Sequence, residues 1–210
     1  FVTNDFPPRS GGIQTFIYEL VRRFPSDQVT VVASAYEGDV EFDATQPYRV
    51  VRSSSSVLLP TTATFKLVRQ VIAETGATRV VFGAAAPLAL MAKKLRPLGV
   101  TKIVALTHGH EAGWARTPIT AQAIRKIGAS VDVLTYLGEY TKTRIASALA
   151  PSDRAKLVKL APAVDPALFN PRNLSQGQEL RGQIGYADRP TIVCVSRLMA
   201  RKGQDSLIRV

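Results

Sequence analysis

The chain has 210 residues, of which 46% are hydrophobic and 20% are charged, and its formal net charge is +11. This composition is typical of a globular protein and excludes a disordered or fibrous one. Its single cysteine cannot form an internal disulfide, and no stretch approaches the roughly 18 consecutive apolar residues of a spanning helix. The 210 residues are therefore neither a disulfide scaffold nor an integral membrane segment.

The pattern of apolar residues predicts strands and helices that alternate along the chain. Runs of β-branched residues indicate buried strands, and apolar residues at spacings of three and four indicate amphipathic helices. Thr61 or Thr62 is a good N-cap and Gly76 a good C-terminal stop for one of these helices. The predicted strands are 1–5, 29–32, 48–52, 79–82, 102–106, 131–135 and 156–160, and the predicted helices are 13–24, 61–75, 87–95, 120–127 and 141–148.

Continuous apolar strands separated by helices predict a parallel sheet buried on both faces, which is a doubly wound α/β domain. We expect this domain to occupy residues 1–165 and a linker to occupy 166–185. A second α/β domain is expected to begin in 186–210, with a buried strand at 191–196 and a helix from Gly203. Because the last residues lie inside an amphipathic pattern, we expect the chain to be a fragment with its second domain truncated.

Basic residues are concentrated in the middle of the chain. Residues 60–160 hold 15 Lys and Arg against 5 Asp and Glu. Such a field attracts anions: phosphorylated small molecules, an anionic membrane surface or nucleic acid. A solvated basic face without a specific partner is the alternative. Acidic residues gather near the front of the chain, where the run Asp39 to Asp43 is expected to form a solvated turn rather than a metal site.

Ligands of open parallel sheets bind at the carboxyl ends of the strands, so the loops that follow strands are candidate sites. The end of the first strand and the loop after it contain Asp5 and the pair Gly11-Gly12 at a helix start. Uncovered N–H groups and the helix dipole suit a phosphate there. The loop lacks the Gly-Lys-Ser/Thr of a Walker loop and the three-glycine dinucleotide spacing, and a tight turn without a ligand remains the alternative.

The two histidines of the chain, His108 and His110, follow the strand 102–106 and precede Glu111. A metal site needs three or four ligands, and no further His or Cys pairing is available. A hydrogen-bonding structural histidine and a polar role in an active site are the other interpretations.

The loop after the strand 191–196 carries three cations, Arg197, Arg201 and Lys202. Arginine binds phosphate oxygens bidentately and lysine supplies a compact charge, so this loop suits a diphosphate. A basic loop without a ligand is the alternative. The segment 161–169 leads out of the first domain and is expected to act as a hinge.

Four segments of the chain, taken together and in their order, resemble the family-4 retaining glycosyltransferases. The segments that carry the resemblance are Asp5-Phe6-Pro7-Pro8 with Gly11-Gly12-Ile13, His108-Gly109-His110-Glu111, Val164-Asp165 with Phe169, and Ser196-Arg197 with Lys202-Gly203. The resemblance implies the GT-B fold, two Rossmann-like domains with the sugar-nucleotide donor held mainly by the second. The stretches 82–92 and 131–136 resemble an actinobacterial subfamily that transfers mannose from GDP-mannose to phosphatidylinositol mannosides.

The resemblance also implies roles for residues of this chain. The backbone at Gly11 and Gly12 would approach the donor diphosphate, and Arg197 and Lys202 would neutralise the leaving nucleoside diphosphate. His108 would hydrogen-bond the transferred sugar. The candidates for shaping the loop or meeting the acceptor are Asp5, His110 and Glu111. The acidic pair with which the family binds the donor ribose and sugar has no counterpart in the chain.

Cleavage of a glycosyl phosphate bond builds negative charge on the diphosphate, and fixed cations stabilise it. Because lysine and arginine can replace Mg²⁺ in this role, we expect no metal and no cofactor apart from the donor substrate. Retention without a carboxylate nucleophile predicts same-face substitution, in which the leaving phosphate helps to deprotonate the acceptor hydroxyl.

The expected acceptor is an anionic phosphatidylinositol glycolipid, reached by peripheral contact with the cytoplasmic face of the plasma membrane. The basic segment, including Arg116, Arg125 and Lys126, is expected to dock on anionic lipid. A soluble sugar-phosphate or inositol acceptor with a GDP- or UDP-sugar donor is the first alternative. A metal-dependent hydrolase built on His108 and His110 is the second. A nucleic-acid module is not expected, because only 7% of residues are aromatic and these are not interleaved with the arginines.

Overall fold

The computed structural model describes residues 1–186 and 189–210, apart from the side chains of Asn173 and Arg201. The chain divides into two compact units, residues 1–162 and 163–210, and each is described by itself. The division falls inside the segment 161–169 that is expected to act as a hinge. The domain boundaries expected from the sequence, and the hinge itself, stay predictions.

The first unit contains one parallel sheet with the strand order β3-β2-β1-β4-β5-β6-β7. The strands are β1 Val2–Thr3, β2 Thr30–Ala33, β3 Arg49–Arg52, β4 Arg79–Phe82, β5 Lys102–Ala105, β6 Val133–Tyr136 and β7 Leu157–Lys159. The chain builds outward from β1 to β3 and then continues on the other side of β1 with β4. This order confirms the predicted doubly wound sheet, and the seven predicted strands of this unit are all found, with ends shifted by a few residues.

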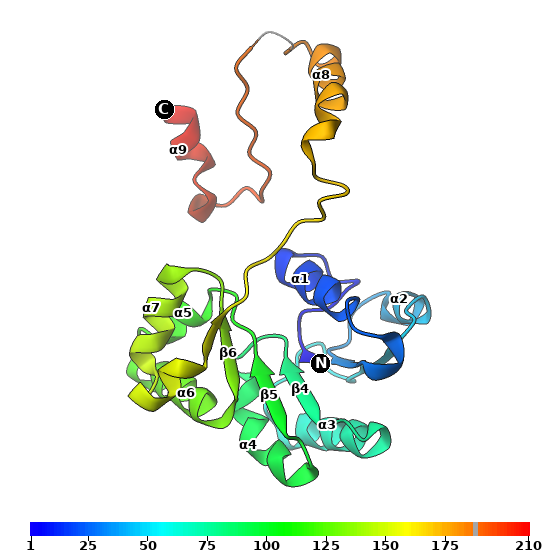
Figure 1. Cartoon of the computed structure of the whole chain (residues 1–210), viewed down its shortest axis with the longest axis vertical. Helices are drawn as coiled ribbons and strands as arrows, with labels where there is room; N and C mark the ends of the chain where they lie inside the picture. Colours follow the sequence, from blue (N-terminus) through cyan, green and yellow to red (C-terminus); the bar gives the residue numbers. More distant parts are fainter. Residues whose placement is uncertain (187–188) are drawn as a thin grey trace. The chain divides into compact units, whose positions relative to one another are not determined.

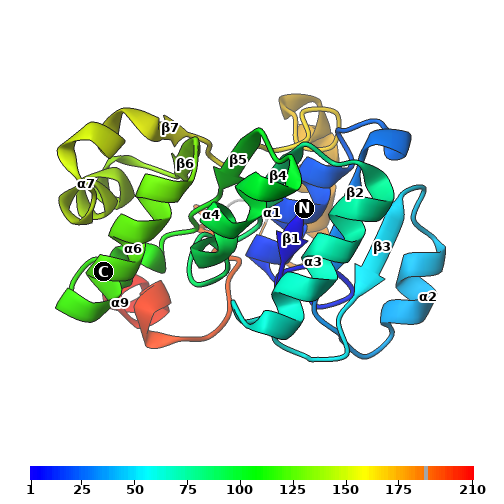
Figure 2. The same ribbon diagram turned by 90° about the horizontal axis from the view of Figure 1, so that it is seen from below.

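Helices cover both faces of the sheet (Figure 2). The helices of this unit are α1 Gly12–Val21, α2 Asp39–Ala44, α3 Thr62–Thr75, α4 Ala92–Leu95, α5 Glu111–Trp114, α6 Pro118–Ser130 and α7 Glu139–Ala148. Successive strand residues point to opposite faces. Val31 and Ala33 therefore join one apolar cluster with residues of α1, whereas Val32 joins the other with residues of α3 and α6.

Helix α3 has the ends that the sequence predicts. The hydroxyl of Thr61 accepts a hydrogen bond from the Thr64 N–H (3.3 Å), and Gly76 ends the helix in the left-handed conformation at φ 66°. The continuous helix predicted over 87–95 is instead a 3-10 turn, Leu88–Met91, followed by α4.

The expected solvated turn at Asp39–Asp43 is wrong, because these residues form helix α2 and both carboxylates face Arg52 at the end of β3. Asp43 accepts two hydrogen bonds from the Arg52 guanidinium (2.7 and 2.9 Å), and Asp39 lies 4.0 Å from it. The same guanidinium donates to the carbonyl oxygens of Pro7 (2.6 Å) and Ser34 (3.1 Å). Arg52 therefore ties α2 to the loop after β1.

We expect Arg52→Ala to lower the free energy of unfolding by about 3 kcal/mol, because it leaves Asp43 and two carbonyl oxygens without their donor. The matched control is Arg49→Ala on the same strand, whose ion pair with Glu74 is solvent-exposed and is expected to contribute less than about 1 kcal/mol. Urea unfolding of both variants measures the difference. Equal losses would show that Arg52 is only a surface ion pair.

The second unit contains helices α8 Leu174–Gln183 and α9 Gln204–Arg209, the latter starting where the sequence predicts (Figure 1). The buried strand predicted at 191–196 is wrong for this structure. The segment is extended but unpaired, and Ile192, Val193 and Val195 are 77–92% exposed. A strand needs a neighbour for its hydrogen bonds, and the described residues of this unit supply none.

Candidate active site

The strand order reverses between β1 and β4, which are neighbours in the sheet but distant in the sequence. In open parallel sheets the loops on either side of such a point diverge, and ligands bind between them beyond the carboxyl ends of the strands. We refer to this place as the crevice. The loops that follow β1, β4 and β5 meet at this point, and they contain Asp5, Gly11 and His108, with Gly12 as the first residue of α1. The structure thus brings together the site residues that the sequence places in the first unit.

Asp5 is held against the first turn of α1. Its Oδ1 accepts a hydrogen bond from Gln14 Nε2 (2.8 Å), and its backbone N–H donates to the Thr3 hydroxyl (2.9 Å). Gln14 is 8% exposed. The carboxylate is therefore oriented by a buried amide at the mouth of the crevice.

Gly11 and Gly12 differ in why they are glycines. A Cβ on Gly11 would come within 2.2 Å of Gln14 Oε1, an atom of the side chain that is held by Asp5. A Cβ on Gly12 meets nothing within 4 Å. Packing within the chain thus requires a small residue at Gly11 and makes no such demand at Gly12, where the space in front of the helix start is open.

We expect Gly12→Ala to leave the free energy of unfolding unchanged or to raise it by up to about 1 kcal/mol, because alanine favours the helix. If the diphosphate approaches this backbone, the added methyl group will raise the Kd for GDP-mannose by about tenfold or more. Thermal unfolding and donor titration of the same variant measure the two effects. Unchanged donor affinity would favour the tight turn without a ligand.

His108 extends from the end of β5 toward β4. Its Nε2 lies 2.5 Å from the carbonyl oxygen of Gly83, and its ring packs edge-on against Phe16 at 5.5 Å between centroids. A carbonyl oxygen only accepts, so Nε2 carries the proton and Nδ1 is the acceptor in the neutral imidazole. The half-buried ring can therefore accept a hydrogen bond from a hydroxyl group.

Gly83 is needed where His108 meets β4. A Cβ at this position would lie 2.4 and 2.5 Å from the Oγ1 and Cβ of Thr3 on β1. The absence of a side chain allows β1 and β4 to approach closely and keeps the Gly83 carbonyl in reach of the imidazole.

Glu111 is fully buried and fixes the loop that carries His108. Its Oε2 accepts a hydrogen bond from the His108 backbone N–H (3.0 Å). Its Oε1 lies 3.2 Å from His110 Nε2 but makes no hydrogen bond within the described part of the chain. The His110 side chain is exposed. Of the two alternatives for Glu111, shaping the loop fits its burial better than meeting an acceptor.

The two histidines do not converge on one point, since His108 Nε2 faces Gly83 and His110 Nε2 faces Glu111. Among residues 1–186 and 189–210, no three His, Cys, Asp or Glu side chains gather as a group that could hold a metal ion. The geometry thus gives no support to the metal hydrolase built on this pair.

Arg197 and Lys202 belong to the second unit and lie on a loop that is organised by Gln204. The Gln204 amide donates to the Ser196 hydroxyl (2.6 Å) and to the Arg197 carbonyl oxygen (2.8 Å). Gly203 takes the left-handed conformation at φ 71° between a 3-10 turn and α9. Both cationic side chains are exposed, and the side chain of Arg201 lies outside the described residues.

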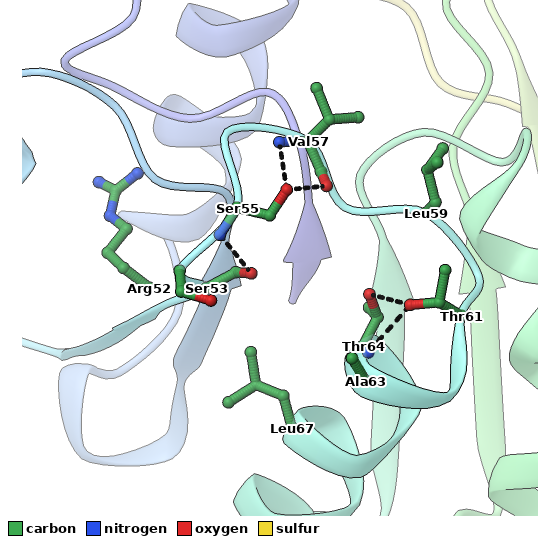
Figure 3. A pocket seen from close by; sticks show the side chains of 10 residues that line it. Arg52, Ser53, Ser55, Val57, Leu59, Thr61, Ala63, Thr64 and Leu67 are labelled. Carbon is green, nitrogen blue, oxygen red and sulfur yellow. Dashed lines mark hydrogen bonds between the residues drawn. The ribbon is translucent and has the colours of Figure 1, made fainter.

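A hollow of about 350 Å³ lies between the loop after β3 and the start of α3 (Figure 3). Two of its hydroxyl groups are used locally: Ser55 donates to the Val57 carbonyl oxygen (2.9 Å), and Thr61 caps α3. Asn4 fastens the loop to β1 through two hydrogen bonds with the Leu58 backbone (2.6 and 2.8 Å). The hollow therefore offers mainly apolar walls.

Three residues around the crevice were not anticipated from the sequence: Gln14, Phe16 and Gly83. The first two read as ordinary positions of an amphipathic helix. Gly83 directly follows a predicted strand, so the rule that ligands bind in the loops after strands could have identified it. The contacts that make them important join segments that are distant in the sequence.

The family model for Glycosyltransferase Family 4 matches residues 10–168. The chain is 44% identical over 213 residues to the GDP-mannose-dependent alpha-(1-6)-phosphatidylinositol monomannoside mannosyltransferase of Mycobacterium tuberculosis, and 45% identical over 215 residues to the enzyme of that name in Mycolicibacterium smegmatis. These matches cover 99% of the chain and 54–55% of each relative. The chain thus spans about half the length of these relatives.

The solved structure of Anabaena Alr3699/HepE in complex with UDP-glucose matches 99% of this chain and 56% of its own, with a TM-score of 0.71 and 16% identity. At this identity the match shows the fold alone, and it confirms the expected GT-B architecture. Arg197 and Lys202 lie beyond the range of the family model but inside the range that the relatives cover.

Proposed function

The chain belongs to glycosyltransferase family 4, and we propose that the whole protein transfers mannose from GDP-mannose to a phosphatidylinositol mannoside. The observation that carries the proposal is the identity of 44–45%, over nearly the whole chain, with two relatives named for this reaction. The crevice at the strand-order reversal supports it, because its residues suit a sugar and a phosphate.

In this proposal the donor diphosphate is bound by charge and by backbone. Arg197 and Lys202 neutralise the leaving GDP, and the open helix start at Gly12 is suited to bind a phosphate through its N–H groups. The reaction needs no metal ion, since the two cations supply the stabilisation that Mg²⁺ supplies in other transferases.

His108 binds the transferred mannose. Because Nε2–H donates a hydrogen bond to the Gly83 carbonyl oxygen, Nδ1 of the neutral ring accepts a hydrogen bond from a sugar hydroxyl. The ring also supports positive charge near the anomeric carbon. The bond from the anomeric carbon to the GDP oxygen breaks, and the acceptor oxygen forms its bond on the same face. The acceptor proton passes to the leaving phosphate, and the configuration is retained.

The acceptor reaches the site from an anionic membrane on the cytoplasmic side, with which the protein makes peripheral contact. None of the helices in the described part of the chain combines the length and the apolar character that are needed to cross a bilayer. Asp5 lies at the mouth of the crevice and is the candidate to meet the acceptor headgroup.

The test is calorimetric titration of the whole protein with GDP-mannose and with UDP-glucose in the presence of EDTA. We expect GDP-mannose to bind and UDP-glucose to bind much more weakly. Binding of UDP-glucose alone would favour the alternative with a UDP-sugar donor. Donor binding that requires added Mg²⁺ would contradict the role given to Arg197 and Lys202.

A further inference from the structure

A groove of about 780 Å³ lies between α4 and α6, on one of the two helical layers. These helices precede β5 and β6, so their carboxyl ends lie at the edge where the strands begin, opposite to the candidate active site (Figure 1). Leu90 and Ala129 give the groove an apolar floor, and its rim carries Lys93, Lys94 and Lys126.

The remaining cation of the groove, Arg96, is part of the fold. Its guanidinium lies 2.9 Å from Asp132 Oδ2 and donates to the Thr101 carbonyl oxygen (2.9 Å). Burial acts to raise the pKa of Asp132, but the hydrogen bond from the Ile103 N–H and the Arg96 guanidinium outweigh it and lower the pKa below its usual value. Arg96 and Asp132 therefore form an ion pair that adds no net charge to the groove.

The three lysines have no such partner. Lys93, Lys94 and Lys126 are exposed, and none forms an ion pair with a described residue of the chain. Lys94 Nζ lies 6.0 Å from the centroid of the Phe65 ring, which holds the ammonium group over the helical layer. Two further exposed cations, Arg79 and Lys102, face one another as Cα partners at the same edge of the sheet.

Grouped like charges repel one another, and the free energy of the folded state falls when an anion compensates them. A free phosphate would use the ammonium groups but not the apolar floor. A phospholipid uses both, because lysines lay their aliphatic stems on apolar surface while their charges meet the headgroups. Nucleic acid would in addition use exposed aromatic rings, and the lining of the groove contains none among its described residues.

We propose that the groove between α4 and α6, with Lys93, Lys94 and Lys126, is the surface by which the protein docks on an anionic phospholipid bilayer. The inference rests on the proposed function, in which the acceptor is a membrane glycolipid. Of the three residues expected from the sequence to dock on lipid, the groove keeps Lys126. Arg116 precedes α6, and Arg125 lies on α6 outside the lining of the groove.

The position of the groove is compatible with access to the acceptor. Helix α6 runs for about 20 Å along the sheet, from the carboxyl edge to the edge where the strands begin. A bilayer that lies against this helical layer therefore extends to the carboxyl edge, where the crevice opens.

The test compares two triple variants by co-sedimentation with vesicles of phosphatidylcholine alone or mixed with phosphatidylglycerol. Lys93→Gln/Lys94→Gln/Lys126→Gln is expected to bind the mixed vesicles about 100-fold more weakly than the unaltered protein. The control, Arg23→Gln/Arg144→Gln/Arg154→Gln, removes the same charge elsewhere and is expected to stay within about threefold. None of the three proteins should bind vesicles of phosphatidylcholine alone.

Equal losses in the two variants would overturn the proposal, because only net charge would then matter. Titration with inorganic phosphate tests whether the three lysines bind free phosphate in place of a lipid headgroup. Phosphate binding that depends on these lysines, without vesicle binding, would also overturn the proposal. Transfer to a detergent-dispersed acceptor should be the same in the lysine variant and the unaltered protein. Failure of that transfer in the unaltered protein would instead refute the proposed function, whatever the vesicles show.

Discussion

Lys202→Ala in the whole protein is expected to lower kcat/KM for GDP-mannose by about 100-fold to 1000-fold, which is about 3–4 kcal/mol of transition-state stabilisation. The reason is that the charge on the leaving diphosphate grows as the glycosyl bond breaks, so a fixed ammonium group acts more strongly on the transition state than on the bound donor. Steady-state kinetics with a saturating acceptor measure the loss. We expect most of it in kcat.

The control is Arg209→Ala, which removes another exposed cation from the same unit. It is expected to change kcat/KM by less than about threefold. Lys202→Arg keeps the charge and should recover part of the activity, although the guanidinium has a different geometry. A Lys202→Ala enzyme that behaves like Arg209→Ala would remove this residue from the diphosphate site.

His108→Ala is expected to lower kcat by about 100-fold or more, with only a small change in the free energy of unfolding. The ring is half-buried and its Nε2 hydrogen-bonds the Gly83 carbonyl oxygen, so removal of the ring leaves this acceptor unpaired at the crevice. The large effect on kcat is expected because the variant loses Nδ1, the atom that we propose accepts a hydrogen bond from the sugar.

His110→Ala is the matched control, because it removes the second imidazole of the same loop. Its side chain is exposed and its Nε2 only approaches Glu111, so we expect less than about a threefold change in kcat. A larger loss in His110→Ala than in His108→Ala would reverse the two roles. Urea unfolding of both variants separates a loss of chemistry from a loss of fold.

The sheet of the first unit is predictable from the sequence because each strand is buried on both faces. Such strands appear as short continuous apolar runs, as in Arg79–Phe82, whose predicted and observed bounds coincide. The residues that cap α3 are also local: Thr61 and Gly76 act on a helix end within a few positions of themselves. Both kinds of signal depend on neighbours in the chain.

The wrong predictions concern segments whose structure depends on interactions with distant parts of the chain. Helix α2 is short and acidic, and it is stabilised by Arg52 and by Phe42 packing on Phe6, neither of which its own sequence reveals. The apolar run 191–196 has the composition of a strand, but a strand forms only where another strand pairs with it.

The candidate site shows the same difference between local signals and contacts with distant segments. The loops after strands pointed to Asp5, Gly12 and His108, because the carboxyl edge of a parallel sheet is fixed by chain direction alone. The partners Gln14 and Gly83 were missed, because a hydrogen bond from Gln14 to Asp5 and the close approach of Gly83 to Thr3 depend on how α1 and β4 pack on β1.

The most direct test of the account is transfer of radiolabelled mannose by the whole protein in EDTA, offered a phosphatidylinositol mannoside in detergent and, separately, a soluble inositol phosphate. We expect label in the glycolipid, joined through an α-linkage, and none in the soluble acceptor. Label in the soluble acceptor alone would contradict the lipid acceptor, and transfer that depends on added metal would contradict the diphosphate site at Arg197 and Lys202.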